Sequence, residues 1–264
     1  GIVDRLRARF RWFDRVMRAQ ERYNKCKGDF YAAGITYFTI FALFPLLMVG
    51  FSVGGFVLAS RPDVLAELED RIRGAVAGDL GQQLVSLMDE AIASRGTVGA
   101  IGLATAAWAG LSWMANLREA LSQMWEQRAE KGGFVATKLS DLFALISTFL
   151  AMVITVCLSA LGDPSLGGGL RVVSVLVSVA ISWMLFAWII ARLPRESVSF
   201  RSSIQAGLLA AIGFEIFKQA GSIYLQSVVT GPAGATFGSV LGLMVFAYIT
   251  ARLILFATAR AATS

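Results

Sequence analysis

The sequence contains no histidine and only two cysteines among its 264 residues. Without imidazole the chain lacks the commonest general base and the commonest protein ligand of metal ions. Catalytic triads and zinc sites that depend on histidine are excluded, and we expect no enzyme activity, no cofactor and no bound metal. Cys26 and Cys157 lie far apart, one in a basic stretch and one in an apolar run. We therefore interpret both as free thiols.

Charged residues are also scarce. They make up 16% of the chain and hydrophobic residues 56%, against about 25% and about 45–50% in ordinary soluble domains. The mean hydropathy is +0.65. This composition excludes a soluble globular enzyme and predicts an all-α integral membrane protein.

Six apolar segments reach the length of about 20 residues that a helix needs to cross a hydrocarbon core of about 30 Å. They are residues 35–59, 97–117, 142–162, 172–191, 202–229 and 236–259. The first four contain no charged residue, whereas the fifth contains Glu215 and Lys218 and the sixth contains Arg252. We predict a polytopic domain of six transmembrane helices over residues 31–260.

The lysines and arginines between the spans indicate the orientation, because these residues accumulate on the cytoplasmic side. With the N-terminus in the cytoplasm, the inner segments hold seventeen of them and the outer segments only five. Both termini are therefore predicted to be cytoplasmic, in agreement with an even number of spans. The first apolar run is too long for a cleaved signal peptide, so we expect it to remain in the mature protein.

Residues 1–30 form a basic segment before the first span, and nine of the 24 lysines and arginines lie before residue 28. Within residues 2–17, apolar positions recur at spacings of three and four. The arginines on the other face include Arg5, Arg9, Arg11 and Arg15. This pattern predicts a cytoplasmic basic amphipathic helix on an anionic membrane surface. A solvated helix that packs on the cytoplasmic ends of the bundle stays open as an alternative. Neither interpretation needs nucleic acid.

The outer segment of residues 61–95 has apolar residues with helical period, together with seven acidic and four basic residues. Gly78 and Gly81 are expected to divide it into two short helices, so we predict an extracytoplasmic helical hairpin. A cap over the outer mouth of the bundle is the preferred interpretation of this loop. A docking surface for an envelope protein is the alternative.

The charged residues of the last two spans are the strongest candidates for a mechanism. Glu215 and Lys218 are three positions apart, so they share a helix face and can form an ion pair. An unpaired charge at bilayer depth costs from about 2.5 to more than 10 kcal/mol, so such residues normally face a bundle interior or a watery cavity. With Arg252 they would form a net positive centre that suits a phosphate or carboxylate head group. The alternatives are a pair that only sets helix register and an Arg252 that reaches the cytoplasmic interface.

Small residues predict where helices approach closely. GxxxG patterns occur in the first and sixth spans, and they also permit a homo-oligomer. Their glycines are Gly50, Gly54, Gly234, Gly238 and Gly242.

Two single residues carry further expectations. Pro45, in the middle of the first span, removes a backbone hydrogen bond and predicts a kink. Asp141, at the inner start of the third span, is expected at a helix N-terminus, where a carboxylate is favourable.

Several motifs resemble those of a known family. Residues 32–47 read AAGITYFTIFALFPLL and include Tyr37 and Pro45, residues 116–125 read NLREALSQMW, and Phe214-Glu215 is followed by Lys218. In order and spacing they resemble the YihY/BrkB family of bacterial inner-membrane proteins, and within it the YhjD branch. The chain departs from the family pattern at Arg252, where we expect a neutral residue, and at residues 257–259, which lack the family's frequent glutamate.

The resemblance implies a multi-pass protein of the bacterial cytoplasmic membrane with a role in envelope integrity. We expect it to bind and translocate or export an anionic lipid or glycolipid. Glu215 and Lys218 would form the polar centre, Arg252 a head-group contact, and Tyr37 and Pro45 the neighbouring helix. The alternative is a non-transporting membrane adaptor that docks an envelope partner through residues 61–95.

Overall fold

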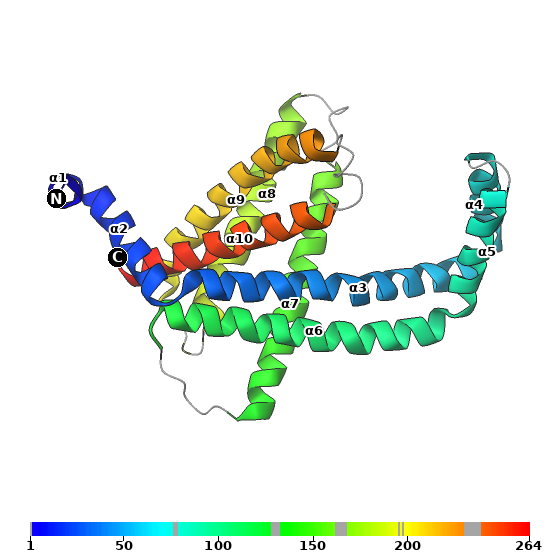
Figure 1. Cartoon of the computed structure of the whole chain (residues 1–264), viewed down its shortest axis with the longest axis horizontal. Helices are drawn as coiled ribbons and strands as arrows, with labels where there is room; N and C mark the ends of the chain where they lie inside the picture. The colour runs from blue at the N-terminus through cyan, green and yellow to red at the C-terminus, as the bar shows by residue number, and fades with distance from the viewer. Residues whose placement is uncertain are drawn as a thin grey trace. The chain divides into compact units, whose positions relative to one another are not determined.

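The computed structural model has only α-helices as regular structure in the part that it describes. That part comprises residues 2–75, 79–127, 133–161, 168–194, 196, 198–229 and 239–264. The helices are α1 (Ile2–Arg9), α2 (Arg11–Lys25), α3 (Gly28–Ser60), α4 (Pro62–Ala75), α5 (Asp79–Ala93), α6 (Arg95–Met124), α7 (Phe134–Leu161), α8 (Gly168–Arg192), α9 (Phe200–Val229) and α10 (Ser239–Ala262) (Figure 1). The all-α fold class is confirmed for these residues.

Four helices of the described part, α3, α6, α8 and α10, are long and apolar enough to cross a membrane. They contain the first, second and fourth predicted spans and most of the sixth. The third and fifth predicted spans fall on α7 and α9, which are 28 and 30 residues long. Length and composition thus support a multi-pass protein, whereas six spans and their orientation stay a prediction.

The helices form two compact units. The first contains residues 1–37 and 111–264, and the second contains residues 38–110.

In the second unit, the later part of α3 packs along the first half of α6, and the contact depends on glycines of α6 (Figure 1). A Cβ atom on Gly102 would lie 2.7 Å from the Cβ of Met48 and 3.3 Å from the carbonyl oxygen of Pro45. The Ser52 hydroxyl, which faces Gly99, donates a hydrogen bond of 2.6 Å to the carbonyl of Arg95. α3 continues as one helix through Pro45.

The glycines expected to bring α3 against another helix, Gly50 and Gly54, make no such contact with the residues that the structure describes. A Cβ atom on Gly50 or Gly54 would meet nothing within 4 Å. A GxxxG pattern marks a face that permits close approach but does not determine which helix face meets a neighbour. Gly234 and Gly238 lie outside the described residues, and Gly242 is half-buried in α10.

The predicted loop of residues 61–95 contains two helices, α4 and α5, which pack against each other. Gly81 does not separate them, because it lies in the first turn of α5. A glycine there costs only about 1 kcal/mol of helix propensity, which the rest of the helix can offset. Gly78 lies outside the described residues.

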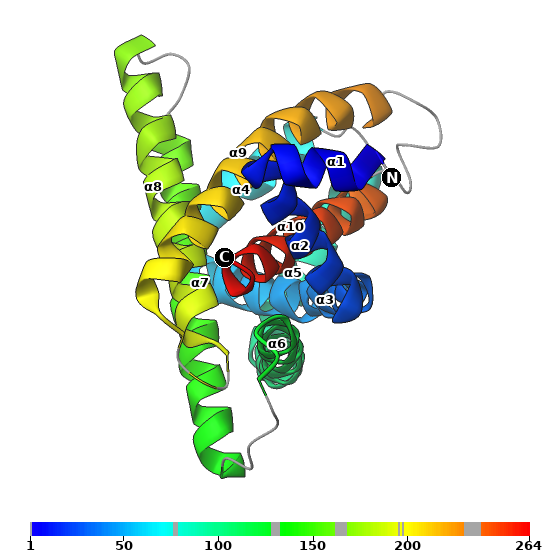
Figure 2. The same ribbon diagram turned by 90° about the vertical axis from the view of Figure 1, so that its left-hand side faces the viewer.

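In the first unit, α8, α9 and α10 pack together (Figure 2), and their core contains alanine, larger aliphatic and aromatic side chains. A Cβ atom on Gly207 of α9 would lie 2.6 Å from the backbone nitrogen of Ala187 in α8. The Trp183 indole donates a hydrogen bond of 2.9 Å to the carbonyl of Ile204. Phe246 of α10 contacts rings of α9, with 5.6 Å between its centroid and that of Phe214.

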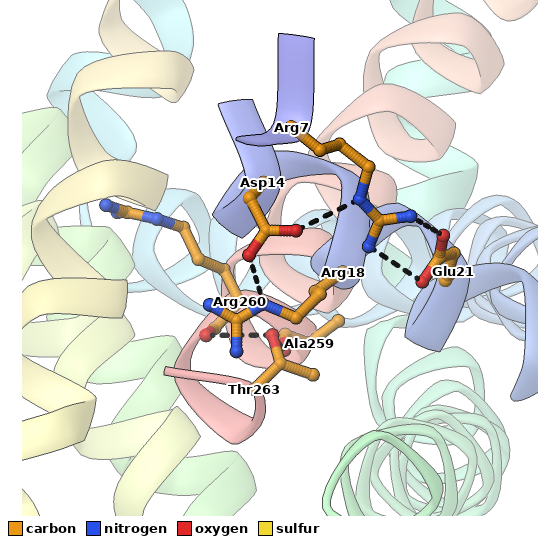
Figure 3. A network of polar contacts seen from close by, with 7 residues as sticks. All are labelled: Arg7, Asp14, Arg18, Glu21, Ala259, Arg260 and Thr263. Atoms are coloured by element: carbon orange, nitrogen blue, oxygen red, sulfur yellow. Dashed lines mark hydrogen bonds and ion pairs between the residues drawn. The ribbon is translucent and has the colours of Figure 1, made fainter. Parts of the chain in front are cut away.

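The amphipathic segment is not the single helix predicted for residues 2–17. The chain is extended at Phe10, which separates α1 from α2, and α2 continues to Lys25. The bend allows Arg7 to bind Asp14 at 3.0 Å and Glu21 at 2.6 Å (Figure 3). In a continuous helix, at about 1.5 Å per residue, Arg7 and Glu21 would lie about 21 Å apart. Helical periodicity alone could not reveal these ion pairs.

We predict that Gly207→Ala lowers the stability of the protein by about 1–3 kcal/mol, because the new methyl group would overlap backbone atoms of α8 that no rotamer change can move. The midpoint of thermal unfolding in detergent measures this effect. Gly50→Ala is the control, since a methyl group there meets open space. Equal midpoints for the two variants would contradict the close α8–α9 contact.

Candidate functional site

The ion pair expected in the fifth predicted span is present on α9. The Lys218 ammonium lies 2.7 Å from a carboxylate oxygen of Glu215, and it also donates to the buried Ser178 hydroxyl of α8 at 3.5 Å. The same ammonium lies 5.3 Å from the ring centroid of Phe214. Two acceptors and an aromatic face thus position the charge of Lys218 between α8 and α9.

The pair is partly covered rather than sealed. The Glu215 side chain is 18% exposed and that of Lys218 is 29% exposed. Removing two charges from water costs several kcal/mol per ion unless they meet good partners, and Ser178 and the Phe214 ring add to what Glu215 supplies. Because the ammonium is still reachable, an anionic group could bind it without unfolding the bundle.

Arg252 belongs to a different polar cluster. Its guanidinium lies 3.1 Å from Asp29 at the start of α3 and over the rings of Tyr23 and Tyr248, at 5.9 and 5.6 Å from their centroids. The Tyr23 hydroxyl donates a hydrogen bond of 2.8 Å to Asp29. Burial, and then the hydrogen bond to Asp29, raise the pKa of Tyr23 well above its usual value.

One positive centre of Glu215, Lys218 and Arg252 stays a prediction. The contacts described for Arg252 and those described for Lys218 have no residue in common. Sequence reasoning missed Asp29, because it lies outside the apolar spans and more than 220 positions from Arg252. Of the other predicted pathway residues, Tyr37 is exposed at the edge of the first unit, and Pro45 is buried in the second.

Arg118 of α6 and Asp141 of α7 form the most buried ion pair of the described residues, at 2.6 Å. Their side chains are 15% and 2% exposed, and Arg118 also donates to the Ser140 hydroxyl at 3.2 Å. Asp141 was expected at a helix N-terminus, but α7 begins at Phe134, so this carboxylate lies about two turns inside. Asp141 is the single carboxylate of the apolar helix α7, and a charge in such a helix normally has a partner. Its position could therefore have predicted an ion pair.

The arginines predicted at the membrane surface, Arg5, Arg9, Arg11 and Arg15, are all exposed on α1 and α2.

Cys26 is half-buried and its thiol donates to the carbonyl of Gln123 at 3.1 Å, while burial raises the pKa of the thiol. The side chain of Cys157 lies outside the described residues. Among the residues that the structure describes, no group of three or more Cys, Asp or Glu could hold a metal ion.

Comparisons with known proteins point to one family. Residues 19–264 match the family model described as virulence factor BrkB. The inner membrane protein YhjD of Escherichia coli K12 is 36% identical, with 94% of this chain and 80% of YhjD aligned. An uncharacterized protein of Dickeya dadantii is 39% identical, with 94% and 82% aligned. A UPF0761 membrane protein of Mannheimia succiniciproducens is 25% identical, with 74% and 70% aligned. No solved structure matches.

We predict that Asp141→Ala destabilises the protein by about 3–5 kcal/mol, because it leaves the Arg118 charge buried without its carboxylate. Thermal unfolding in detergent measures the loss. The control is Glu67→Ala on α4, which removes one partner of an exposed pair with Arg71 at the same distance of 2.6 Å and should cost about 0–1 kcal/mol. The double change Arg118→Met/Asp141→Leu should recover stability, because it removes both charges. A double variant as unstable as Asp141→Ala would show that the unpaired charge of Arg118 does not cause the loss of stability.

Proposed function

Because the chain belongs to the BrkB family of membrane proteins, we propose that this multi-pass inner-membrane protein binds and translocates or exports an anionic lipid or glycolipid. The family is one of membrane proteins, and none of the three relatives is named for an enzymatic activity. The proposal therefore concerns binding and movement of a molecule rather than its chemical conversion.

The Glu215–Lys218 pair on α9 is the observation that carries this proposal. Charges are rare in membrane helices and usually belong to a substrate or ion pathway when they remain accessible to polar groups. Lys218 keeps 29% of its side chain exposed while it lies against Ser178. A phosphate or carboxylate head group could take over the ammonium from Glu215, and the surrounding apolar helices would accept the acyl chains.

A six-span bundle with both termini in the cytoplasm completes the proposal. Four long apolar helices, together with α7 and α9 at the remaining predicted spans, support the number six. The excess of lysine and arginine in the inner segments supports the orientation. In this topology α4 and α5 lie outside the cytoplasm, α1 begins in the cytoplasm and α10 ends there.

A membrane adaptor is the second candidate function, and it is favoured by the surface of α5. An open hollow of about 650 Å³ on this helix is lined by Asp79, Gln82, Gln83, Ser86 and Leu87. Leu84 and Leu87 are also exposed. A polar hollow beside exposed leucines could dock an envelope protein. In that case the Glu215–Lys218 pair would serve only the assembly of the bundle.

The lipid proposal predicts that purified wild-type protein retains a specific anionic lipid, and that the Glu215→Gln/Lys218→Met variant loses it because both charges of the site are gone. Native mass spectrometry of the protein extracted from bacterial membranes identifies the retained lipid. The matched control is Glu67→Gln/Arg71→Gln, which removes an exposed ion pair of α4 and should keep the lipid.

The midpoint of thermal unfolding is measured on the same samples. Should the double variant be unstable, Lys218→Gln replaces it, because this change removes the ammonium, and Lys218→Arg, which keeps the charge, should still retain the lipid. Wild type, variant and control carrying the same unselective lipid would refute the lipid proposal, and the exposed face of α5 would then be the place to search for a partner.

A further inference from the structure

In the N-terminal arm, residues 2–25 with α1 and α2, Asp14 and Glu21 bind arginines of the arm itself. Asp14 binds Arg7 at 3.0 Å and Arg18 at 3.1 Å, and Glu21 binds Arg7 at 2.6 Å (Figure 3). Arg22 and Lys25 instead pair with Glu126 after the end of α6. Four of the arm's basic residues are thus neutralised by carboxylates of the protein.

The remaining four basic residues of the arm form a set with no carboxylate partner in the described part of the chain. They are Arg5, Arg9, Arg11 and Arg15. Arg5 and Arg9 are one turn apart on α1, and Arg11 and Arg15 are one turn apart on α2, so each pair occupies one helix face. All four are exposed.

Large apolar side chains lie beside these arginines and are equally uncovered. The Ile2 side chain is 79% exposed and that of Trp12 is 65% exposed, and Leu6, Phe10 and Val16 are also exposed. Arg9 lies 5.6 Å from the ring centroid of Phe10, and Trp12 packs edge-on against Phe13 at 5.8 Å. Positive charge interleaved with aliphatic and aromatic groups, tryptophan included, is typical of helices at a lipid interface.

The arm is fixed in place at its C-terminal end. Ala19 and Tyr23 of α2 are buried, and the Tyr23 ring contacts Phe256 of α10 at 6.5 Å between centroids. Only two residues separate α2 from α3, a helix long and apolar enough to cross a membrane. The exposed half of the arm therefore starts close to the level at which α3 enters the bilayer.

We infer that the N-terminal arm docks on the anionic phospholipid surface of the membrane, through Arg5, Arg9, Arg11 and Arg15 and the apolar side chains between them. Charge complementarity identifies the occupant, because the cytoplasmic leaflet carries the negative lipids that attract such segments. The inference rests on a cytoplasmic N-terminus and does not depend on whether the protein moves lipid. The sequence left two interpretations of this segment open, a helix that packs on the bundle and a helix that lies on the membrane surface. The second half of α2 packs on the bundle, and we assign membrane binding to α1 and the first half of α2.

Hydrogen exchange of residues 2–17 tests the inference with the whole protein in lipid nanodiscs. An isolated helix as short as α1 is marginal in water, so its amides exchange fast unless the arm is docked. In nanodiscs that contain one quarter phosphatidylglycerol, we expect exchange at least tenfold slower than in pure phosphatidylcholine nanodiscs. We expect 0.5 M salt to remove most of the difference.

Three variants complete the experiment. The quadruple change of Arg5, Arg9, Arg11 and Arg15 to glutamine should abolish the response to phosphatidylglycerol, and the same four changes to lysine should preserve it. Changing Arg61, just before α4, and Arg71 and Arg73 of α4 to glutamine removes exposed charge elsewhere and should leave the response intact. Wild-type exchange that is equal in the two lipids, or a glutamine variant that still responds, would overturn the inference.

Discussion

Charges inside an apolar helix bundle must meet opposite charges, because each unpaired ion would cost several kcal/mol. Two pairs in the first unit satisfy this requirement, Arg118 with Asp141 at 2.6 Å and Lys218 with Glu215 at 2.7 Å, and a third, exposed pair joins Arg252 to Asp29 at 3.1 Å. Two of the pairs join different helices, α6 to α7 and α3 to α10. A shift of one helix along its neighbour would separate the charges, so these pairs help set the register of the unit.

Polar contacts near the surface attach the N-terminal arm. Arg22 donates a hydrogen bond of 3.1 Å to the carbonyl of Met124, and Lys25 lies 2.7 Å from Glu126, which lowers the pKa of that carboxyl. Cations at the carbonyl end of α6 also complement its helix dipole. With α2 held there, Tyr23 lies between Asp29, Arg252 and Phe256. The first half of the arm, which makes no such attachment, is left with its arginines and apolar groups exposed.

Local spacing explains which polar contacts could be predicted. Glu215 and Lys218 are three residues apart on one helix, so their ion pair follows from helical geometry. Arg118 and Asp141 lie on successive helices, and Asp29 is far from Arg252 along the chain, so their pairing depends on how helices pack. Contacts at glycines also depend on how the helices pack, which the glycine spacing does not show. Gly50 and Gly54 predicted a contact on α3, whereas Gly102 and Gly207 form the close contacts, because a short motif does not say which face meets a neighbour.

The sequence by itself determined the membrane class, the helical fold and the approximate positions of the long helices, since apolar length and composition are properties of continuous segments. It also determined the Glu215–Lys218 pair and the basic amphipathic character of the N-terminus. Only the tertiary structure decided that Arg252 binds Asp29, that Asp141 is buried against Arg118, and that the arm bends at Phe10. These features join residues that are distant in the chain or depend on a break in the helix, and no local periodicity encodes them.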